Sequence, residues 1–480
     1  MLADPGGFPA MPVAIAPMTR IAELPGPPAL PMIGNAHQIS RPLFHQRLEA
    51  WQRAYGDIYR MRIWAREFVV FADPHVAAEA LRERPGTFGR TERVSTTATE
   101  MGFGGLFASN GEKWRRQRPM VMAAFDPGHI KRYFPSLVQV SARLAARWTR
   151  AARAGEAVPL QQDLMRYTVD VIAGLAFGTD INTLEGEQDV IQRHMDKIFP
   201  MLFRRTLAPF PYWRHFKLPA DRRLDVHLQA FRAAVQEFIA TARERMRAQP
   251  ALRESPTNLI EAMLAARDQP GNALTDEDVA ANVATMLLAG EDTTAHTLAW
   301  MIWLLAQQPA LLRRAQEEVR QALGDDPLPT RIEQLAALAF VEACAHETMR
   351  LKPVAPLLPQ QAEHDTSVAG VAIPQGTLCI FLMRPGAMDG RRFADPERFD
   401  PDRWLRADAS SVKRASMPFG AGPRMCPGRY LALLEIKMAM ATLLARFDVL
   451  SVEAADGAPV QEQLAFTMQP TPLRMRIAAR

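Results

Sequence analysis

The segment Phe419-Gly-Ala-Gly-Pro-Arg-Met-Cys-Pro-Gly428 guides the interpretation of this chain, because it places one cysteine in a loop of glycines and prolines. Residues 429–446 follow directly and are mostly strong helix formers, so a helix is expected there. Glycines before a helix let the backbone approach a flat ligand closely, and a helix start favours a nearby thiolate. One cysteine cannot form a zinc site. A lone thiolate suits haem iron, where the porphyrin supplies the other four donors.

The pattern Phe-x-x-Gly-x-Arg-x-Cys-x-Gly in this segment resembles the haem-binding loop of the cytochrome P450 monooxygenases. The alternative is a glycine-rich loop that caps a helix around a buried structural cysteine. The resemblance implies that Cys426 is the axial iron ligand of haem b. It also implies that the loop residues Phe419, Gly420, Arg424 and Gly428 contact the cofactor.

Composition limits the possible classes of protein. The chain has 480 residues, of which 48% are hydrophobic and 23% charged, as in folded soluble proteins. Lys and Arg exceed Asp and Glu by only five (57 − 52), which is too diffuse an excess to argue for nucleic acid. Cys344, Cys379 and Cys426 are widely spaced, so no disulfide framework is expected and a reducing cytoplasm fits. No apolar run is long enough for a membrane anchor.

The expected organisation is a proline-rich lead-in over residues 1–40, followed by a single catalytic domain over 41–480. Periodicity predicts a mainly α protein with a small β-rich lobe, including a hairpin over residues 58–71. The resemblance implies the α+β, prism-like cytochrome P450 fold. Residues 86–112 show no clear period and are expected to be a long loop, and residues 200–219 interrupt the helical pattern. The resemblance implies that the first segment covers the substrate pocket and that the second forms a mobile lid and access channel, although an ordinary buried helix–loop corner is the alternative for the second.

A long central helix is predicted from Thr275 to Leu305, about 45 Å at 1.5 Å per residue. Its apolar pattern is broken by Ala289-Gly-Glu-Asp-Thr-Thr294. Buried polar side chains must find partners, so such a conflict often marks a working site, although a satisfied polar kink is the alternative. The break resembles the family's oxygen-activation motif. The resemblance implies that Ala289 and Gly290 border the haem and that Asp292 and Thr293 are catalytic.

Two other groups of residues match the family. Glu347 and Arg350, an i, i+3 pair, would alone indicate a surface ion pair. The resemblance implies instead a buried network completed by Arg398.

Trp114 and Arg118 would alone indicate a solvated basic helix face. The resemblance implies that they bind the haem propionates together with Arg424. Gln360 and Gln361 stand where many family members have a further propionate-binding arginine, so this contact is in doubt.

Ten residues are expected by family position to line the substrate pocket, although core packing explains any one of them equally well. They are Met101, Phe103, Leu106, Phe203, Met286, Val354, Leu357, Leu358, Phe466 and Met468.

The resemblance, taken from Leu24 to the C-terminus, implies a haem-thiolate monooxygenase that inserts one oxygen atom from O2 into a lipophilic molecule such as a fatty acid, terpenoid or steroid. Electrons would come from a ferredoxin or flavodoxin and an NAD(P)H reductase. The alternatives are a peroxide-using haem-thiolate hydroxylase or isomerase, and a haem-binding sensor without turnover. The retained Asp292–Thr293 pair argues against both.

Overall fold

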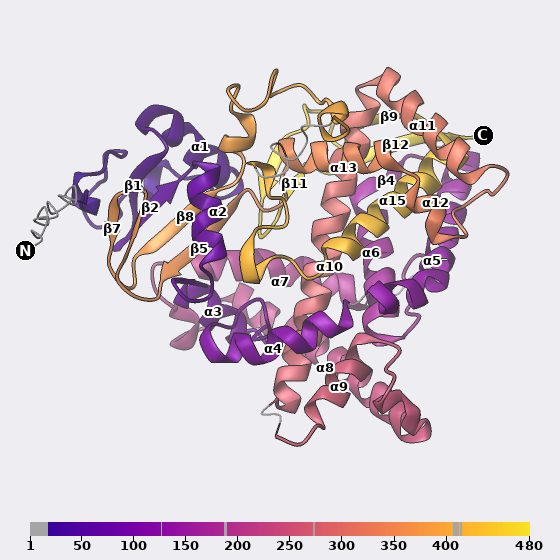
Figure 1. Ribbon diagram of the computed structural model, residues 1–480, viewed down its shortest axis with the longest axis horizontal. Helices are drawn as coiled ribbons and strands as arrows, with labels where there is room; N and C mark the ends of the chain where they lie inside the picture. Colours follow the sequence, from indigo (N-terminus) through magenta and orange to yellow (C-terminus); the bar gives the residue numbers. More distant parts are fainter. Residues whose placement is uncertain (1–17, 126, 187–189, 272–273, 407–411, 413–414) are drawn as a thin grey trace, which may run out of the picture.

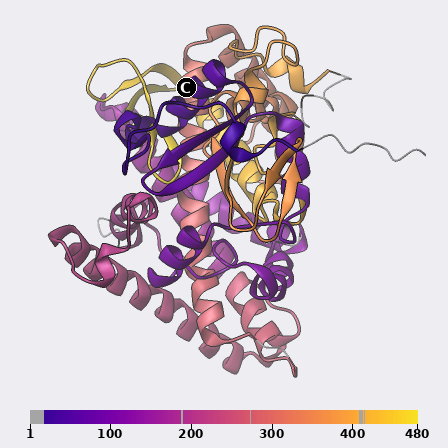
Figure 2. The ribbon, with the colours of Figure 1, turned by 90° about the vertical axis from the view of Figure 1, so that its left-hand side faces the viewer.

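The computed structural model describes residues 18–125, 127–186, 190–271, 274–406, 412 and 415–480, and most of these residues are helical. Helices form most of a roughly triangular body (Figures 1 and 2). The expected mainly helical class with a small β lobe is confirmed. The helices are α1 (Phe44–Tyr55), α2 (Pro74–Arg82), α3 (Glu92–Glu100), α4 (Gly111–Ala124), α5 (Pro127–Ala154), α6 (Leu160–Phe177), α7 (Val190–Leu207), α8 (Pro219–Ala248), α9 (Leu259–Arg267), α10 (Asp276–Ala306), α11 (Pro309–Leu323), α12 (Ile332–Ala336), α13 (Ala339–Leu351) and α15 (Arg429–Arg446).

The β lobe is built on a five-stranded sheet in which β1 and β2 form the predicted hairpin and β2 pairs in parallel with β8. The order of its strands is β1 (Ile58–Ile63), β2 (Arg66–Phe71), β8 (Leu378–Leu382), β5 (Leu357–Ala362) and β3 (Phe88–Gly89). The smaller sheets pair β6 (Thr366–Val368) with β7 (Val371–Ile373), β12 (Leu473–Ala479) with β4 (Val158–Pro159) and β9 (Phe447–Ala454), and β10 (Glu462–Leu464) with β11 (Met468–Pro470). The strands of the five-stranded sheet and β7 gather on one side of the body, and β4, β9 and β12 lie among the helices on the other side (Figure 1).

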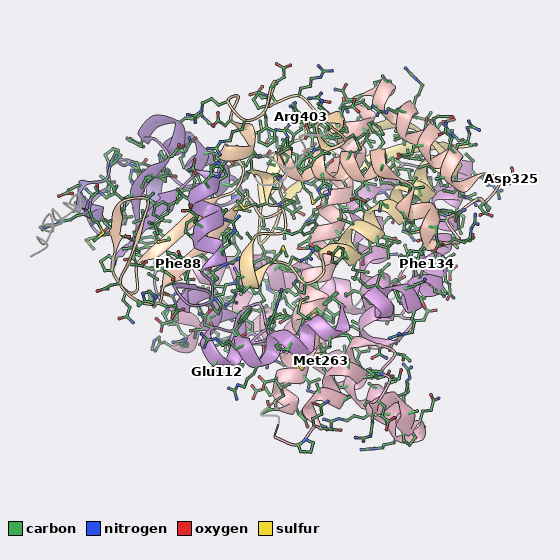
Figure 3. All side chains as sticks on the ribbon, in the orientation of Figure 1. Phe88, Glu112, Phe134, Met263, Asp325 and Arg403 are labelled. Atoms are coloured by element: carbon green, nitrogen blue, oxygen red, sulfur yellow. The ribbon has the colours of Figure 1, made fainter. Side chains whose placement is uncertain are left out.

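The central element is α10, which runs through the middle of the body (Figure 1). Thr275 caps its first turn: the Asp278 N–H donates to the Thr275 hydroxyl, and the Thr275 N–H donates to the Asp278 carboxylate, each at 3.1 Å. The helix contacts α6, α8, α13, α15 and β11, so the core is arranged around it. Side chains fill the spaces between elements, with Phe134 in the helical part and Phe88 in the β lobe (Figure 3).

Two expectations about the regions over the pocket are wrong. Residues 86–112 are not a continuous loop, because they contain the nine-residue helix α3, capped by the Thr91 hydroxyl. Its Ser- and Thr-rich sequence has weak helix propensity, and the burial of Thr97 and Ala98 explains why it is helical nevertheless. The interruption expected over residues 200–219 begins later than predicted, because α7 continues through Pro200 to Leu207, and residues 208–218 separate it from α8.

Within the described ranges, no helix is both long and apolar enough to cross a lipid bilayer.

Candidate functional site

The cysteine loop is folded back on itself directly before α15. The backbone N–H of Cys426 donates a hydrogen bond of 3.0 Å to the carbonyl oxygen of Phe419. Gly422 has φ +72°, and a Cβ there would lie 2.4 Å from the carbonyl oxygen of Leu81, so the loop can pass α2 only with glycine at this position. The packing thus fixes the loop, and with it the half-buried Cys426, against the rest of the protein.

Opposing effects act on the thiol of Cys426. Burial raises its pKa, while the backbone N–H of Gly428 and the positive charges of Arg118 and Arg429 lower it. The net direction is upward, so the helix start alone does not produce the thiolate that the sequence led us to expect. Coordination to a metal would do so, because a coordinating thiol is deprotonated outright.

Four arginines cluster at this loop: Arg424 belongs to it, Arg84 and Arg118 donate to its carbonyls, and Arg90 lies close enough to repel Arg424. None forms an ion pair with a carboxylate of the described residues. Burial and mutual repulsion lower the pKa of Arg424 to about 8 and that of Arg84 to about 9, and burial lowers that of Arg90 to about 10. Such a buried cluster of like charges destabilises the fold unless an anion neutralises it.

The guanidinium groups of these arginines donate instead to backbone carbonyls. Arg118 bonds to Met425 at 2.7 Å, and Arg424 bonds to Ser109 at 2.8 Å. The ring of Trp114 lies between these two arginines, 6.0 Å from Arg118 and 5.2 Å from Arg424. The structure therefore brings together Trp114, Arg118 and Arg424, the three residues expected to bind propionates.

Sequence reasoning missed Arg84 and Arg90. Strands β3 and β5 pair Gly89 with Gln361, so the next residues in register are Arg90 and Gln360. Gln360 is buried and its side-chain N–H donates to the neighbouring carbonyl of Pro359 at 2.7 Å. Arg90, the residue directly after β3, is thus next in register to Gln360, near which the family resemblance predicted a cation. Strand pairing, which one sequence does not reveal, was the missing signal.

The polar break of α10 borders an open space. Ala289 is exposed, and Gly290 and Thr293 are half-buried, although Leu288 before them and Thr294 after them are buried. The Thr293 hydroxyl donates to the Ala289 carbonyl at 2.8 Å. At Gly290, a Cβ would lie 3.0 Å from Ile172 on α6. Close packing of α10 on α6 thus favours glycine here, and a place beside the haem stays a prediction.

Asp292 is buried beside the C-terminal hairpin. Its carboxylate accepts a hydrogen bond of 3.5 Å from the hydroxyl of Thr467, which precedes β11. The acid of the polar break is therefore held on one side by a residue far away in sequence.

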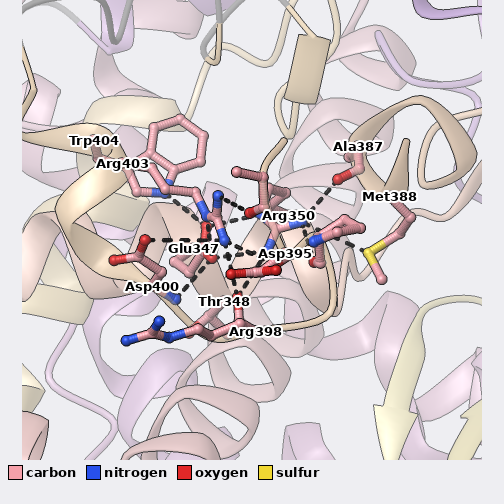
Figure 4. Close-up of polar contacts among 12 residues, drawn as sticks. Glu347, Thr348, Arg350, Ala387, Met388, Asp395, Arg398, Asp400, Arg403 and Trp404 are labelled. Atoms are coloured by element: carbon pink, nitrogen blue, oxygen red, sulfur yellow. Dashed lines mark hydrogen bonds and ion pairs between the residues drawn. The ribbon is translucent and has the colours of Figure 1, made fainter. Parts of the chain in front are cut away.

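The buried network around Glu347 differs from the expected one in one member. Glu347 is fully buried and accepts bonds of 2.7 and 2.8 Å from Arg350, 3.1 Å from Arg403 and 2.9 Å from the Trp404 indole (Figure 4). The side chain of Arg398 is exposed, and this residue contributes only its carbonyl, which accepts from Arg350 at 3.2 Å and from Arg403 at 3.5 Å. The expected Glu347–Arg350–Arg398 triad is thus corrected to Glu347–Arg350–Arg403.

The expected pocket residues do not all lie in one place. Four of them, Met101, Phe103, Leu106 and Met286, are buried in the large helical core. Phe466 forms an aromatic cluster that the sequence did not reveal, with ring centroids 5.6 Å from Phe107 and 5.4 Å from Phe199. Met468 is buried in the core cluster beside the β lobe, and Phe203 and Leu357 pack against that cluster. Leu358 packs against a separate core cluster of the β lobe. Val354 is half-buried.

An open cavity of about 440 Å³ lies between α3, the end of α7 and the five-stranded sheet. Its lining includes Thr97, Leu207, Pro211 and Ile380. Residues 91–97 and 206–214 of this lining fall in the two segments expected over the pocket, but the lining includes none of the ten residues expected to line the substrate pocket.

A haem fits these residues better than a bare metal ion, because it brings iron for one sulfur and carboxylates for the arginines. Among the described residues no group of three or more His, Cys, Asp or Glu side chains could hold an ion. The fold and the site thus define the class of haem-thiolate proteins.

The sequence model of the family described as Cytochrome P450 matches residues 24–477, so the chain belongs to that family. It is a cytochrome P450 monooxygenase and a haem protein. It is 29% identical to pentalenene oxygenase of Streptomyces avermitilis, over 95% of this chain and 97% of that protein. It is 28% identical to cyclooctat-9-en-7-ol 5-monooxygenase of Streptomyces melanosporofaciens, over 89% and 92%. The crystal structure of the cytochrome P450DA heme domain shares its fold, with a TM-score of 0.84 at 24% identity, over 97% of this chain and 98% of that one.

Proposed function

We propose that the protein uses O2 and two electrons from a separate carrier to insert one oxygen atom into a lipophilic small molecule. The observation that carries this proposal is the Asp292–Thr293 pair, which lies at the turn of α10 where Ala289 opens an otherwise buried helix. An acid beside a hydroxyl is the arrangement needed to deliver protons to a reacting oxygen.

The residues around the loop would hold haem b. Bound through Cys426, the haem would supply an electron-rich iron at which oxygen is activated. Arg84, Arg90, Arg118 and Arg424 with Trp114 would bind its propionates, since these carboxylates would neutralise the arginine cluster. The hydroxyl of Thr293 would orient a water at the open face of α10, and the carboxylate of Asp292 would pass protons to that water.

The electron carrier is proposed to be an acidic ferredoxin or flavodoxin supplied by an NAD(P)H reductase. The basic residues near the cysteine side support this: Lys113, Arg115, Arg116, Lys131 and Arg132 are exposed, and Arg429 is half-buried. Lys437 is less available, because it pairs with Glu342 at 2.7 Å. Reduction should slow steeply as salt rises, since screening shortens the range of electrostatic steering. The free thiols of Cys344 and Cys379 support a reducing cytoplasm.

The substrate is proposed to be a fatty acid, terpenoid or steroid. The aromatic cluster of Phe107, Phe199 and Phe466 offers an apolar surface. The relatives named for pentalenene and cyclooctat-9-en-7-ol support a lipophilic substrate. A steroid 17-alpha-hydroxylase/17,20 lyase of Bison bison, 25% identical over 94% of this chain and 91% of that protein, supports it as well. Candidate compounds can be found by the spin-state change that they cause in the haem spectrum.

The test uses a compound found in this way, O2, a ferredoxin and its reductase. Thr293→Ala should lower the ratio of product to reductant consumed and raise hydrogen peroxide, because proton delivery loses its hydroxyl while the helix remains. Thr285→Ala is the matched control: its hydroxyl makes the same bond to its own helix, at 2.7 Å to Ala281, two turns earlier. Turnover with hydrogen peroxide but not with the carrier would favour the peroxide-using alternative, and binding without any turnover would favour a sensor.

A further inference from the structure

The C-terminal hairpin places one hydroxyl between two polar side chains of α10. The Thr467 Oγ1 atom lies 3.5 Å from Asp292 Oδ2 and 3.1 Å from His296 Nδ1. All three side chains are buried, with 6%, 7% and 2% of their surface exposed. Asp292 and His296 are one helical turn apart, so they share a face of α10.

The hydrogen bonds in this group have a definite direction. The hydroxyl of Thr467 has one proton and donates it to the carboxylate of Asp292, so it accepts from the N–H of His296 Nδ1. Burial lowers the pKa of His296 to about 4, so the ring is neutral and Nε2 carries no proton. This Nε2 is buried without a hydrogen-bond partner among the described residues.

A purely structural role explains the group poorly. The hairpin is already anchored by the Met468 N–H, which donates to the carbonyl of Val354 at 2.8 Å, and by Glu462, which accepts a bond of 2.7 Å from Lys352. A buried imidazole with one unpartnered nitrogen costs free energy that an apolar side chain would avoid. Such a cost is characteristic of a working site.

The hydrogen bonds run from His296 through Thr467 to Asp292, and the two ends of this line have different surroundings. Asp292 precedes Thr293 at the open turn of α10. One turn beyond His296, the ring of Trp300 lies 5.0 Å from the Lys352 ammonium, and Lys352 lines a charged cavity of about 770 Å³ with Glu49 and Arg384. The hydrogen bonds end at His296, and the next turn of α10 lies beside Lys352, a residue that lines the polar cavity.

We propose that Thr467 and His296 are positioning residues that hold the carboxylate of Asp292 in the orientation from which it delivers protons beside Thr293. This inference rests on the proposed oxygenase function and deepens it. The histidine fixes the hydroxyl, and the hydroxyl fixes the carboxylate, so neither residue needs to touch substrate or haem.

The kinetic experiment compares Thr467→Val, which keeps the shape and removes the hydroxyl, with Thr467→Ser, which restores it. Thr467→Val should lower kcat about tenfold without changing KM, since a hydrogen bond to a charged group is worth about that factor. It should also enlarge the solvent isotope effect, and Thr467→Ser should recover most of the rate. Thr471→Val is the matched control, because it removes a hydroxyl from the same hairpin. Among the described residues, the Thr471 hydroxyl only accepts a hydrogen bond of 3.4 Å from the Gln461 N–H.

A double-mutant cycle separates positioning from general damage to the fold. In an Asp292→Asn background, Thr467→Val should have little further effect, because the group on which it acts is gone. An undiminished tenfold loss in that background would overturn the proposal.

A second measurement does not depend on turnover. Nitrogen NMR of the reduced carbonyl form should show the Nδ1–H tautomer of neutral His296, and Thr467→Val should remove this preference. An Nε2–H tautomer in the unaltered protein would overturn the geometry. Absence of product with O2 and carrier, together with the expected tautomer, would instead refute the proposed oxygenase function.

Discussion

The Nε of Arg403 donates a hydrogen bond of 3.1 Å to Oε1 of Glu347, a carboxylate with no exposed surface. This bond joins α13 to the segment that leads to the cysteine loop. Arg350 completes the network from the same helix as Glu347, so one acid is shared by two cations (Figure 4).

Removing either Glu347 or Arg403 should be strongly destabilising. Glu347→Ala leaves two buried guanidinium groups without their anion, and Arg403→Ala removes a buried partner, so each should lower the free energy of unfolding by about 3–5 kcal/mol. Arg398→Ala is the control, because its exposed side chain should change stability by less than about 0.5 kcal/mol. Denaturant unfolding of the haem-loaded proteins measures all three. Equal losses in Arg398→Ala and Arg403→Ala would contradict the network described here.

Cys426 should be the iron ligand among the three cysteines. Cys426→His should abolish the red-shifted Soret band of the reduced carbonyl complex, because imidazole replaces the thiolate. Cys344→Ala and Cys379→Ala should keep the band, since both thiols are buried elsewhere, and alanine avoids burying a hydroxyl. A thiolate-type spectrum in Cys426→His would refute the assignment.

Arg90 should have opposite effects on the empty and the loaded protein. Arg90→Gln removes one of four mutually repelling cations, so the haem-free chain should become more stable to denaturant. The same change removes a propionate partner, so haem should transfer faster to an acceptor protein. Arg391→Gln is the control, because the Arg391 side chain is 80% exposed and pairs with Asp389 on the surface. The idea fails if Arg90→Gln destabilises both forms equally.

Glu435 should make the stability depend on pH. Burial on α15 raises its pKa to about 8, from an ordinary value of 4.5. Between these values the folded state binds more protons than the unfolded one, so the free energy of unfolding should fall as pH rises from about 4.5 to 8. Glu435→Gln should remove this contribution, so the variant should gain stability relative to the parent as pH rises through this range. Parallel pH profiles for the two proteins would show that Glu435 is not responsible.

Local signals in the sequence predicted many of the helices and strands. Thr275 and the apolar pattern after it located α10 within a residue, because capping and periodicity act over a few residues. The error at Arg398 has a different origin: two arginines follow one another at a short distance, and only the tertiary fold selects which side chain reaches Glu347. The same limit applies to Arg90 and to Thr467, whose partners come from strand pairing and from a hairpin far along the chain. The division into residues 1–40 and 41–480 stays a prediction.

The four arginines around the cysteine loop have a consequence for the life of the protein in a cell. A chain that finishes synthesis before haem arrives must keep uncompensated positive charge within its fold. Such a chain would open more often and be removed by proteases, whereas the loaded chain would be spared. The amount of this enzyme should therefore follow the supply of haem, so that its abundance reports iron and porphyrin status even when transcription is constant.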